Sequence, residues 1–154
     1  MSQEARADAS VLIAYDGSDY AKAAITQAGR QLRTPRAAIV LSVFEPLEAL
    51  PFWGVAYARV PAGFAEEAEQ QANDVALEGA TLAGEAGFEA EATAIEGSPV
   101  WKRITEVAKD REAGLIVIGS HGRSGFSYAA MGSVATAVAH HATAPVLICR
   151  LANS

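Results

Sequence analysis

The sequence of 154 residues lacks features that define several protein classes. It contains one cysteine, Cys149, which excludes a disulfide scaffold and a cysteine-based zinc site and fits a reducing compartment. Its uninterrupted apolar runs are about six residues long, whereas a membrane-spanning helix needs roughly 20. The first ten residues are polar and lack the apolar core of a secretory signal. We therefore expect a cytoplasmic globular protein that does not enter a membrane.

Basic residues are also few, and they are unevenly distributed. The chain has 12 Lys and Arg against 18 Asp and Glu, and this net charge of −6 argues against nucleic-acid binding because phosphate contacts need a basic face. No Lys or Arg lies between Arg59 and Lys102, and this stretch holds nine of the acidic residues. We interpret the acidic stretch, residues 62–97, as a solvated face. A docking surface for a basic partner is the alternative.

The sequence does contain a regular series of strand signals. Four short runs are almost entirely apolar and rich in β-branched residues, which is typical of strands covered on both faces of a parallel sheet. These runs are residues 11–15, 39–44, 115–118 and 146–149. A fifth run, residues 88–95, alternates apolar and polar residues, which indicates a half-exposed strand at a sheet edge.

Helical patterns separate the predicted strands. Apolar residues recur with helical spacing over four segments, residues 25–32, 64–82, 100–108 and 131–138. We expect the third of these helices to begin at Pro99 with Ser98 as its N-cap, and to end at a left-handed Gly114. The strict alternation predicts one α/β domain, residues 1–154 with a core over about 9–150, built on an open parallel sheet.

The turns that follow the strands are the expected place for a ligand, because open parallel sheets bind ligands beyond the carboxyl ends of their strands. Asp16 follows the first strand, and the turn GSHGRSG, with three glycines in seven residues, follows the fourth. Gly132 and Ser133 then open the last helix, whose free N–H groups can receive an anion. A phosphate cradle is one interpretation of this pattern. Glycines that serve only the turn are the other.

Three familiar motifs are missing from the sequence. No GxxxxGK[ST] loop is present, which argues against a P-loop nucleotide site. The glycines after the fourth strand are spaced GxxGxxG, unlike the GxGxxG fingerprint of dinucleotide-binding folds. The GxSxG elbow of α/β-hydrolases is also absent.

The spacing Gly119-x2-Gly122-x9-Gly132-Ser133 resembles the ATP-binding signature of the universal stress protein family. The flanking segments LIVIGSHGRSG and APVLICR, and the opening VLIAYDGSDYAKAAI, are also similar, so the resemblance extends over residues 9–150. It implies the fold of adenine nucleotide alpha hydrolases, an open five-stranded parallel sheet in the order 3-2-1-4-5 with helices on both faces. Members are usually dimeric, and we expect a homodimer through the apolar last strand, residues 146–149.

The resemblance also implies an adenine-nucleotide site. Asp16 would contact the ribose hydroxyls, while Ala14, which is often Pro in nucleotide-binding members, and Val43 would flank the adenine. The glycine motif would hold the ribose and the phosphates, and His121 and Arg123 lie within the same turn. The full set of candidate residues is Ala14, Asp16, Val43, Ile118, Gly119, His121, Gly122, Arg123, Gly132, Ser133 and Val134.

The expected ligand is ATP, or ADP or AMP, with Mg²⁺ or Mn²⁺ held mainly through the phosphates. The expected function is a nucleotide-dependent switch in a stress response, with an unknown protein partner and at most slow hydrolysis. Phosphoryl transfer needs metal ligands, a nucleophile and charge neutralisation, for which Asp16, Ser133 and Arg123 are the candidates. The alternatives are a slow ATPase or phosphotransferase, a nucleotide-free dimeric interaction module, and a flavin carrier of similar topology.

Other notable residues have structural interpretations. We expect Cys149 to pack in a buried strand, and the adjacent His140 and His141, which lack the i, i+4 spacing of a metal pair, to lie at a helix end. A general-base role for His121 is not expected, because nothing in the sequence supplies an orienting carboxylate. The segment 45–61 is interpreted as a loop over the mouth of the sheet, or alternatively as a binding or oligomer surface.

Overall fold

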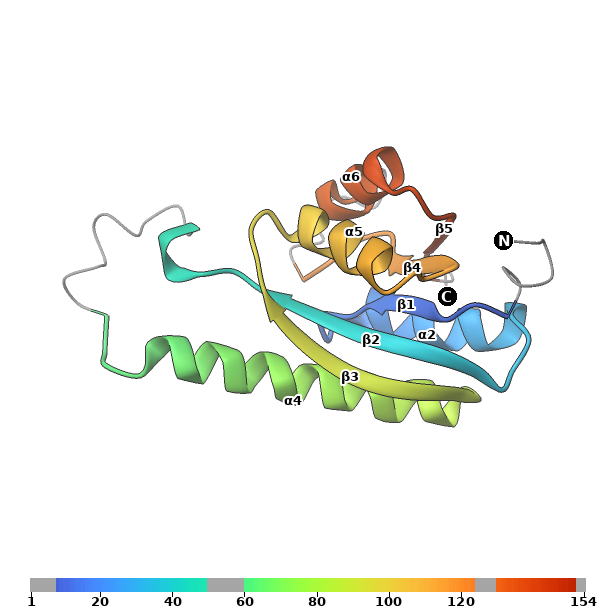
Figure 1. Ribbon diagram of the computed structural model, residues 1–154, viewed down its shortest axis with the longest axis horizontal. Coiled ribbons are helices and arrows are strands. Elements are labelled where there is room, and N and C mark those ends of the chain that lie inside the picture. Colours follow the sequence, from blue (N-terminus) through green and yellow to red (C-terminus); the bar gives the residue numbers. More distant parts are fainter. Residues whose placement is uncertain (1–7, 50–59, 124–129, 152–154) are drawn as a thin grey trace.

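The computed structural model describes residues 8–49, 60–123 and 130–151, and its helices and strands alternate as predicted (Figure 1). In chain order the elements are β1 (Val11–Ala14), α2 (Asp19–Gln31), β2 (Arg36–Phe44), the 3-10 helix η1 (Leu47–Ala49), α4 (Phe64–Glu85), β3 (Phe88–Glu96), α5 (Val100–Asp110), β4 (Leu115–Gly119), α6 (Ser133–His141) and β5 (Val146–Cys149). None of the helices in these ranges has the length and hydropathy needed to cross a membrane.

The five strands form one parallel sheet in the order β3-β2-β1-β4-β5, which confirms the prediction. β1 lies at the centre, where Ile13 is opposite Val40 of β2 on one side and Val117 of β4 on the other. The chain leaves β1 toward β2 and later crosses to β4, so the carboxyl ends of β1 and β4 form the switch point of the sheet.

Helices cover both faces of the sheet, with α2 and α4 on one face and α5 and α6 on the other (Figure 1). Successive residues of β1 point to opposite faces, so Val11 and Ile13 pack with α2 and α4, whereas Leu12 packs with α5 and α6. Each of these three side chains is 0% exposed. Burial on both faces explains why the central strands are continuous apolar runs.

Two helix boundaries differ from the prediction. Pro99, not Ser98, is the N-cap of α5, and the Ser98 hydroxyl instead donates a hydrogen bond to Glu45 at 2.9 Å. Gly114 does not end that helix in a left-handed conformation; Glu112 has the positive φ of 51°, and the Gly114 N–H donates to the carbonyl of Ser10. In both cases the predicted residue has a tertiary partner in place of the expected role at the helix end.

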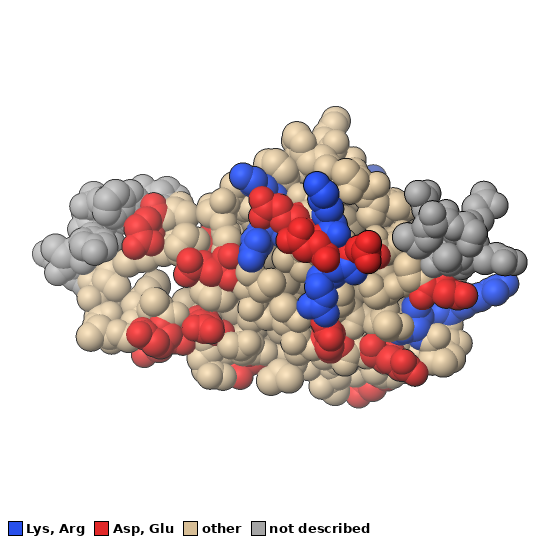
Figure 2. Space-filling model, viewed as in Figure 1, with Lys and Arg blue, Asp and Glu red and all other residues tan. Residues whose placement is uncertain are grey.

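The acidic stretch lies on the surface, and all nine of its carboxylate residues are exposed. Figure 2 shows acidic side chains over the amino-terminal part of α4, and no Lys or Arg of the described residues lies beside them there. Two of the nine form ion pairs, Glu78 with Lys22 and Glu91 with Arg111. This arrangement fits a solvated face, and a docking role stays a prediction. Most of the predicted loop 45–61 lies outside the described residues.

Cys149, predicted to be buried, and His140 and His141, predicted to lie at a helix end, have the expected positions. Cys149 is 3% exposed, its Sγ lies 3.9 Å from the carbonyl oxygen of Ala24, and burial raises the pKa of its thiol. His140 and His141 are exposed in the last turn of α6. The ring of His141 stacks on Trp101 of α5 with 4.4 Å between centroids, so it contributes to the contact between these two helices.

Candidate functional site

A cavity of about 690 Å³ opens at the carboxyl ends of β1, β2 and β4, where the sequence predicted a ligand. The ends of these strands and the turns after them form one side, and residues of α4, α5 and α6 complete the wall. All eleven candidate residues line this cavity: Ala14, Asp16, Val43, Ile118, Gly119, His121, Gly122, Arg123, Gly132, Ser133 and Val134. Their contact with a nucleotide stays a prediction.

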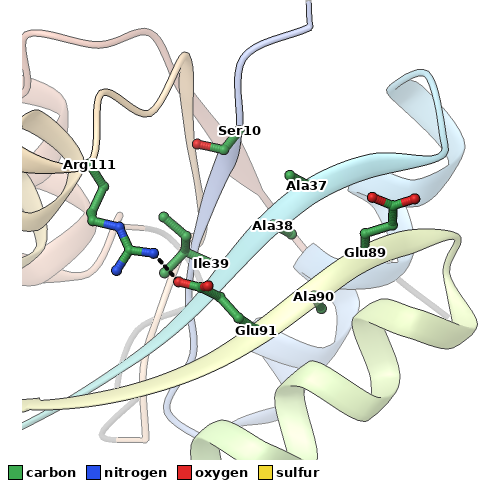
Figure 3. A pocket seen from close by; sticks show the side chains of 8 residues that line it. All are labelled: Ser10, Ala37, Ala38, Ile39, Glu89, Ala90, Glu91 and Arg111. Atoms are coloured by element: carbon green, nitrogen blue, oxygen red, sulfur yellow. Dashed lines mark hydrogen bonds and ion pairs between the residues drawn. The ribbon is translucent and has the colours of Figure 1, made fainter.

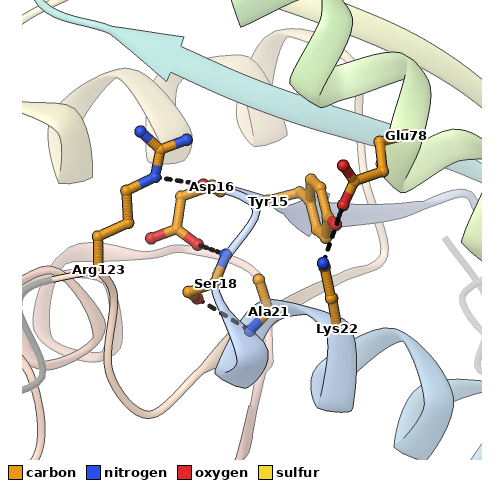
Figure 4. A network of polar contacts seen from close by, with 7 residues as sticks. All are labelled: Tyr15, Asp16, Ser18, Ala21, Lys22, Glu78 and Arg123. Carbon is orange, nitrogen blue, oxygen red and sulfur yellow. Dashed lines mark hydrogen bonds and ion pairs between the residues drawn. The ribbon is translucent and has the colours of Figure 1, made fainter.

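Asp16 is oriented by the turn between β1 and α2. The chain turns at Gly17, whose φ of 80° favours glycine, and the Ser18 hydroxyl then caps α2 by accepting a hydrogen bond from the Ala21 N–H at 3.2 Å. The N–H of Ser18 donates to Asp16 Oδ1 at 2.9 Å (Figure 4). One carboxylate oxygen is thereby fixed, and the other, Oδ2, is directed toward Gly122.

Gly122 and Arg123 bring the turn after β4 against Asp16. A Cβ atom on Gly122 would lie 2.9 Å from Asp16 Oδ2, so a larger residue would displace the carboxylate. Arg123 Nε donates a hydrogen bond to the main-chain carbonyl of Asp16 at 2.6 Å (Figure 4). These contacts join the two turns of the switch point and direct a guanidinium group along the cavity wall.

Gly119 has a structural reason to be glycine. A Cβ atom at this position would lie 2.8 Å from the main-chain carbonyl carbon of Tyr20 in the first turn of α2. The absence of a side chain therefore lets α2 pack closely against the end of β4. This packing accounts for the residue type at position 119 without a ligand.

His121 directs both of its ring nitrogens to protein atoms. Nδ1 lies 2.9 Å from Ser120 Oγ, Nε2 contacts the carbonyl oxygen of Ala130, and the ring centroid lies 4.8 Å from that of Tyr20. Because a carbonyl only accepts hydrogen bonds, we assign the ring proton to Nε2 and let Nδ1 accept from the Ser120 hydroxyl. Neither nitrogen is then free to act as a general base.

Helix α6 begins at the cavity without a side-chain cap. Its N-cap is Gly132, whose own N–H donates to the Ser120 carbonyl at 2.7 Å. Ser133 and Val134 of the first turn line the cavity. The first N–H groups of a helix have no intrahelical acceptor and lie at the positive end of the helix dipole, so this part of the wall favours an anion.

A second polar network joins β1 to α4 beside the cavity (Figure 4). The Tyr15 hydroxyl donates to Glu78 Oε1 at 2.5 Å, and Lys22 Nζ lies 3.3 Å from the same oxygen. Burial, followed by the contacts with Glu78, raises the pKa of Tyr15 above its usual range. The hydrogen bonds from Tyr15 and Lys22 lower the pKa of Glu78. Tyr15 therefore stays protonated and Glu78 ionised, which favours the contact.

The sequence analysis missed the helix residues in the wall. Gln71 and Val75 of α4 and Ile104 of α5 line the cavity, together with the strand-end residue Tyr15. Val75 and Ile104 belong to the apolar helical patterns at residues 64–82 and 100–108, for which the sequence analysis named no ligand contact. One sequence signal could have indicated these residues: the apolar pattern at residues 64–82 is longer than a short strand, so part of it had to extend beyond the strand end.

A second cavity, of about 530 Å³, lies where β2 and β3 begin (Figure 3). The ion pair between Arg111 and Glu91 crosses this cavity. Its lining residues are Ser10, Ala37, Ala38, Ile39, Glu89, Ala90, Glu91 and Arg111. Parallel sheets place ligands at the opposite end of their strands, so this cavity is separate from the candidate site. Within the described ranges, no three His, Cys, Asp or Glu side chains are grouped to hold a metal ion.

Comparisons with known proteins agree with the fold and the motif. Residues 9–150 match the family described as "Universal stress protein family". Over 150 residues the chain is 33% identical to the universal stress protein YxiE of Bacillus subtilis, and the match covers 91% of this chain and 97% of that protein.

Solved structures of this family have a similar fold. A universal stress protein from Archaeoglobus fulgidus in complex with dAMP has a TM-score of 0.60 at 23% identity, covering 92% of this chain and 97% of that one. The crystal structure of a universal stress protein in complex with cAMP has a TM-score of 0.65 at 21% identity, covering 94% of this chain and 98% of that one. The family match and the Bacillus relative each span most of the sequence, and the chain therefore belongs to the universal stress protein family.

Proposed function

We propose that this chain binds an adenine nucleotide, ATP or its relatives ADP and AMP, in the cavity at the carboxyl ends of β1, β2 and β4. The proposal is carried by one observation, which is that the Asp16 carboxylate, the Gly122–Arg123 turn and the start of α6 meet at a single cavity. A carboxylate can accept hydrogen bonds from ribose hydroxyls, and an arginine and a helix amino end that line the same cavity favour phosphate.

The size and the apolar wall of the cavity support a nucleotide. Its volume of about 690 Å³ lies within the range of roughly 300–1,000 Å³ that is common for small-molecule sites. Ala14, Val43 and Ile118 line it from three neighbouring strand ends and would flank the base. The complexes of two similar proteins with cAMP and dAMP support adenine as that base.

The proposed activity is binding with at most slow hydrolysis. His121, the imidazole in the turn after β4, has both ring nitrogens engaged by protein atoms, so it does not supply a base for an attacking water. Mg²⁺ or Mn²⁺ would be held mainly through phosphate oxygens and water. The nucleotide would then act by stabilising one arrangement of the turn after β4.

We also propose that the protein is a homodimer through β5 and that a protein partner in a stress response detects its nucleotide state. β5 is an edge strand without a charged residue, which favours pairing with a second copy. The carbonyl of Cys149 in this strand accepts the Ser120 N–H at 2.8 Å. The strand proposed to form the dimer is thus hydrogen-bonded directly to the glycine turn, so a change in the turn can be transmitted through β5 to the dimer.

Calorimetry with ATP and Mg²⁺ tests the nucleotide site. We expect Asp16→Ala to lower the affinity for ATP by about tenfold or more, since it removes charge-assisted hydrogen bonds to the ribose, while circular dichroism stays unchanged. Asp110→Ala is a matched control, because this exposed residue ends α5 at the opposite end of the sheet. Equal affinity in the wild type and Asp16→Ala would contradict the proposed site.

The competing functions give different results in the same series. A wild-type protein that shows neither heat of binding nor a thermal shift with ATP would favour the nucleotide-free interaction module. Phosphate release well above background that disappears in Asp16→Ala would favour the slow ATPase or phosphotransferase.

A further inference from the structure

We propose that His121 is a positioning residue that sets the affinity for the phosphate chain of the nucleotide without contacting it through a free ring nitrogen. His121 ties Ala130, two residues before the N-cap of α6, to the turn after β4, and it thereby places the start of α6 at the cavity. This inference rests on the proposed nucleotide binding and extends it to the residue that arranges the phosphate end of the site.

The first observation is that the imidazole is held on three sides. Its Nε2 contacts the carbonyl of Ala130, its Nδ1 lies 2.9 Å from Ser120 Oγ, and its ring lies 4.8 Å from the ring of Tyr20 at an angle of 45°. Ala130 is two residues before the N-cap of α6 and is itself part of the cavity wall. The contact with Nε2 therefore fixes the entry to α6.

The second observation is that Ser120, which supports the contact between His121 and Ala130, is itself held firmly in place. Ser120 is 2% exposed, and its N–H donates to the carbonyl of Cys149 in β5 at 2.8 Å. Its carbonyl accepts the N–H of Gly132 at 2.7 Å, and its hydroxyl reaches His121. Two separate links, through His121 to Ala130 and through Ser120 to Gly132, thus hold the same short segment.

The chemistry of a neutral imidazole suits this position. The ring presents a donor at Nε2 and an acceptor at Nδ1 on opposite sides, and here it meets a carbonyl on one side and a hydroxyl on the other. A glutamine can supply the donor that reaches the Ala130 carbonyl, whereas alanine supplies neither group. The two substitutions therefore separate the link to Ala130 from the bulk of the ring.

The consequence for binding depends on which part of the ligand is tested. Ala130, Gly132 and Ser133 line the end of the cavity where the helix dipole favours an anion, whereas Asp16 and Val43 approach from β1 and β2. Loss of the His121 link removes the contact with Ala130 and leaves the bond between Ser120 and Gly132, so the first group should become less firmly placed while the second stays in position. The affinity for a ligand with phosphates should fall, and the affinity for the nucleoside should not.

The experiment measures the affinities for ATP and for adenosine in the wild type, His121→Ala, His121→Gln and the control His140→Ala. For His121→Ala we expect ATP affinity to fall about tenfold and adenosine affinity to change by less than about twofold. His121→Gln should recover most of the ATP affinity. His140→Ala should match the wild type, because His140 is exposed in the last turn of α6.

Several outcomes would overturn the inference. Equal losses for ATP and adenosine would show general loosening of the fold, and an unchanged ATP affinity in His121→Ala would show no role. If the wild type binds ATP and His121→Ala gives either of these two results, the positioning role is refuted and the proposed nucleotide binding is not. A wild type that binds neither ligand refutes the proposed function, and this inference with it.

A measurement on the unmodified protein guards against a variant that does not fold. Nitrogen NMR of the wild-type His121 ring should show a proton on Nε2, since that nitrogen donates to the Ala130 carbonyl. A proton on Nδ1 alone would contradict the link and overturn the inference.

Discussion

Gly119 and Gly122 lie three residues apart at the end of β4, and they face different neighbours. A Cβ atom on Gly119 would meet the rigid backbone of α2 at Tyr20, 2.8 Å away. A Cβ atom on Gly122 would meet the end of the Asp16 side chain at 2.9 Å. Backbone in a packed helix cannot move without cost, whereas a carboxylate can rotate away. A side chain at position 119 would therefore affect packing and stability, and one at position 122 would affect the position of the Asp16 carboxylate.

The matched substitutions Gly119→Ala and Gly122→Ala should separate stability from binding. We expect Gly119→Ala to lower the free energy of unfolding by about 1–3 kcal/mol, as is common for an inserted methyl group in a close-packed contact. Gly122→Ala should change it by less than about 0.5 kcal/mol and should weaken ATP binding, because the new methyl group displaces the carboxylate of Asp16. Denaturant unfolding and calorimetry measure the two effects. Wild-type stability of Gly119→Ala would contradict the packing role.

The sequence predicted the position of these residues better than their roles. Asp16 follows one buried strand and Gly122 lies in the turn after another, and parallel strands bring such turns together at one edge of the sheet. The resemblance to the universal stress protein family supplied the other candidate residues. The role of Gly119 could not be predicted, because it depends on how closely Tyr20 of another element approaches. The contacts of His121 were missed for the same reason, since a sequence does not show which carbonyl an imidazole reaches.

At the scale of elements, burial explains which predictions were correct. Strands covered on both faces must be apolar throughout, which made β1 and β4 recognisable from short runs. Helix ends depend on single residues, and such a residue can form a tertiary contact in place of a cap. Here the Ser98 hydroxyl donates to Glu45, and the Gly114 N–H donates to the carbonyl of Ser10. The helix-end roles predicted from local sequence were therefore wrong at residues that form a hydrogen bond with a distant part of the chain.

Helix α4 extends the wall of the candidate site, and one polar contact fixes it to the central strand. The Tyr15 hydroxyl, at the end of β1, donates to Glu78 in α4, and Lys22 of α2 approaches the same carboxylate. Tyr15 is 2% exposed and adjoins Asp16. The contact thus links three elements immediately beside the switch point.

This contact predicts a specific loss of stability at high pH. The pKa of Tyr15 is raised from its ordinary value of 10.0, chiefly by burial and then by Glu78. Above this ordinary value the unfolded chain has lost the proton that the folded chain still holds, so the free energy of unfolding falls as the pH rises. The contribution of the neutral hydroxyl is fully present below that pH.

Tyr15→Phe should remove this part of the pH dependence. We expect urea unfolding of the wild type to show a steeper decline in stability above about pH 10 than Tyr15→Phe shows, and the two proteins to decline in parallel below that pH. At neutral pH the variant should be less stable, because it loses a hydrogen bond to a charged acceptor. Parallel declines in both proteins at high pH as well would contradict the assignment of the high-pH loss to Tyr15.

At the scale of the whole molecule, the two edges of the sheet differ. The β3 edge carries the exposed Glu89 and Glu91, and charged side chains on an edge oppose pairing with another strand. The β5 edge consists of four apolar residues, Val146–Cys149, of which the first three are only partly buried. One edge is therefore protected against pairing, and the other is suited to it.

This asymmetry predicts a homodimer through β5. Light scattering should give a mass of twice the 16.0 kDa chain at micromolar concentration. Val146→Lys should produce a monomer, because it places a charge in the apolar edge, whereas Thr93→Lys adds the same charge to the β3 edge and should leave the dimer intact. A wild-type monomer, or a dimer lost in Thr93→Lys and kept in Val146→Lys, would contradict the assigned edge. The Ser120 N–H donates to the Cys149 carbonyl and so joins the glycine turn to β5, and the same variants should therefore also show whether dimer formation changes ATP affinity.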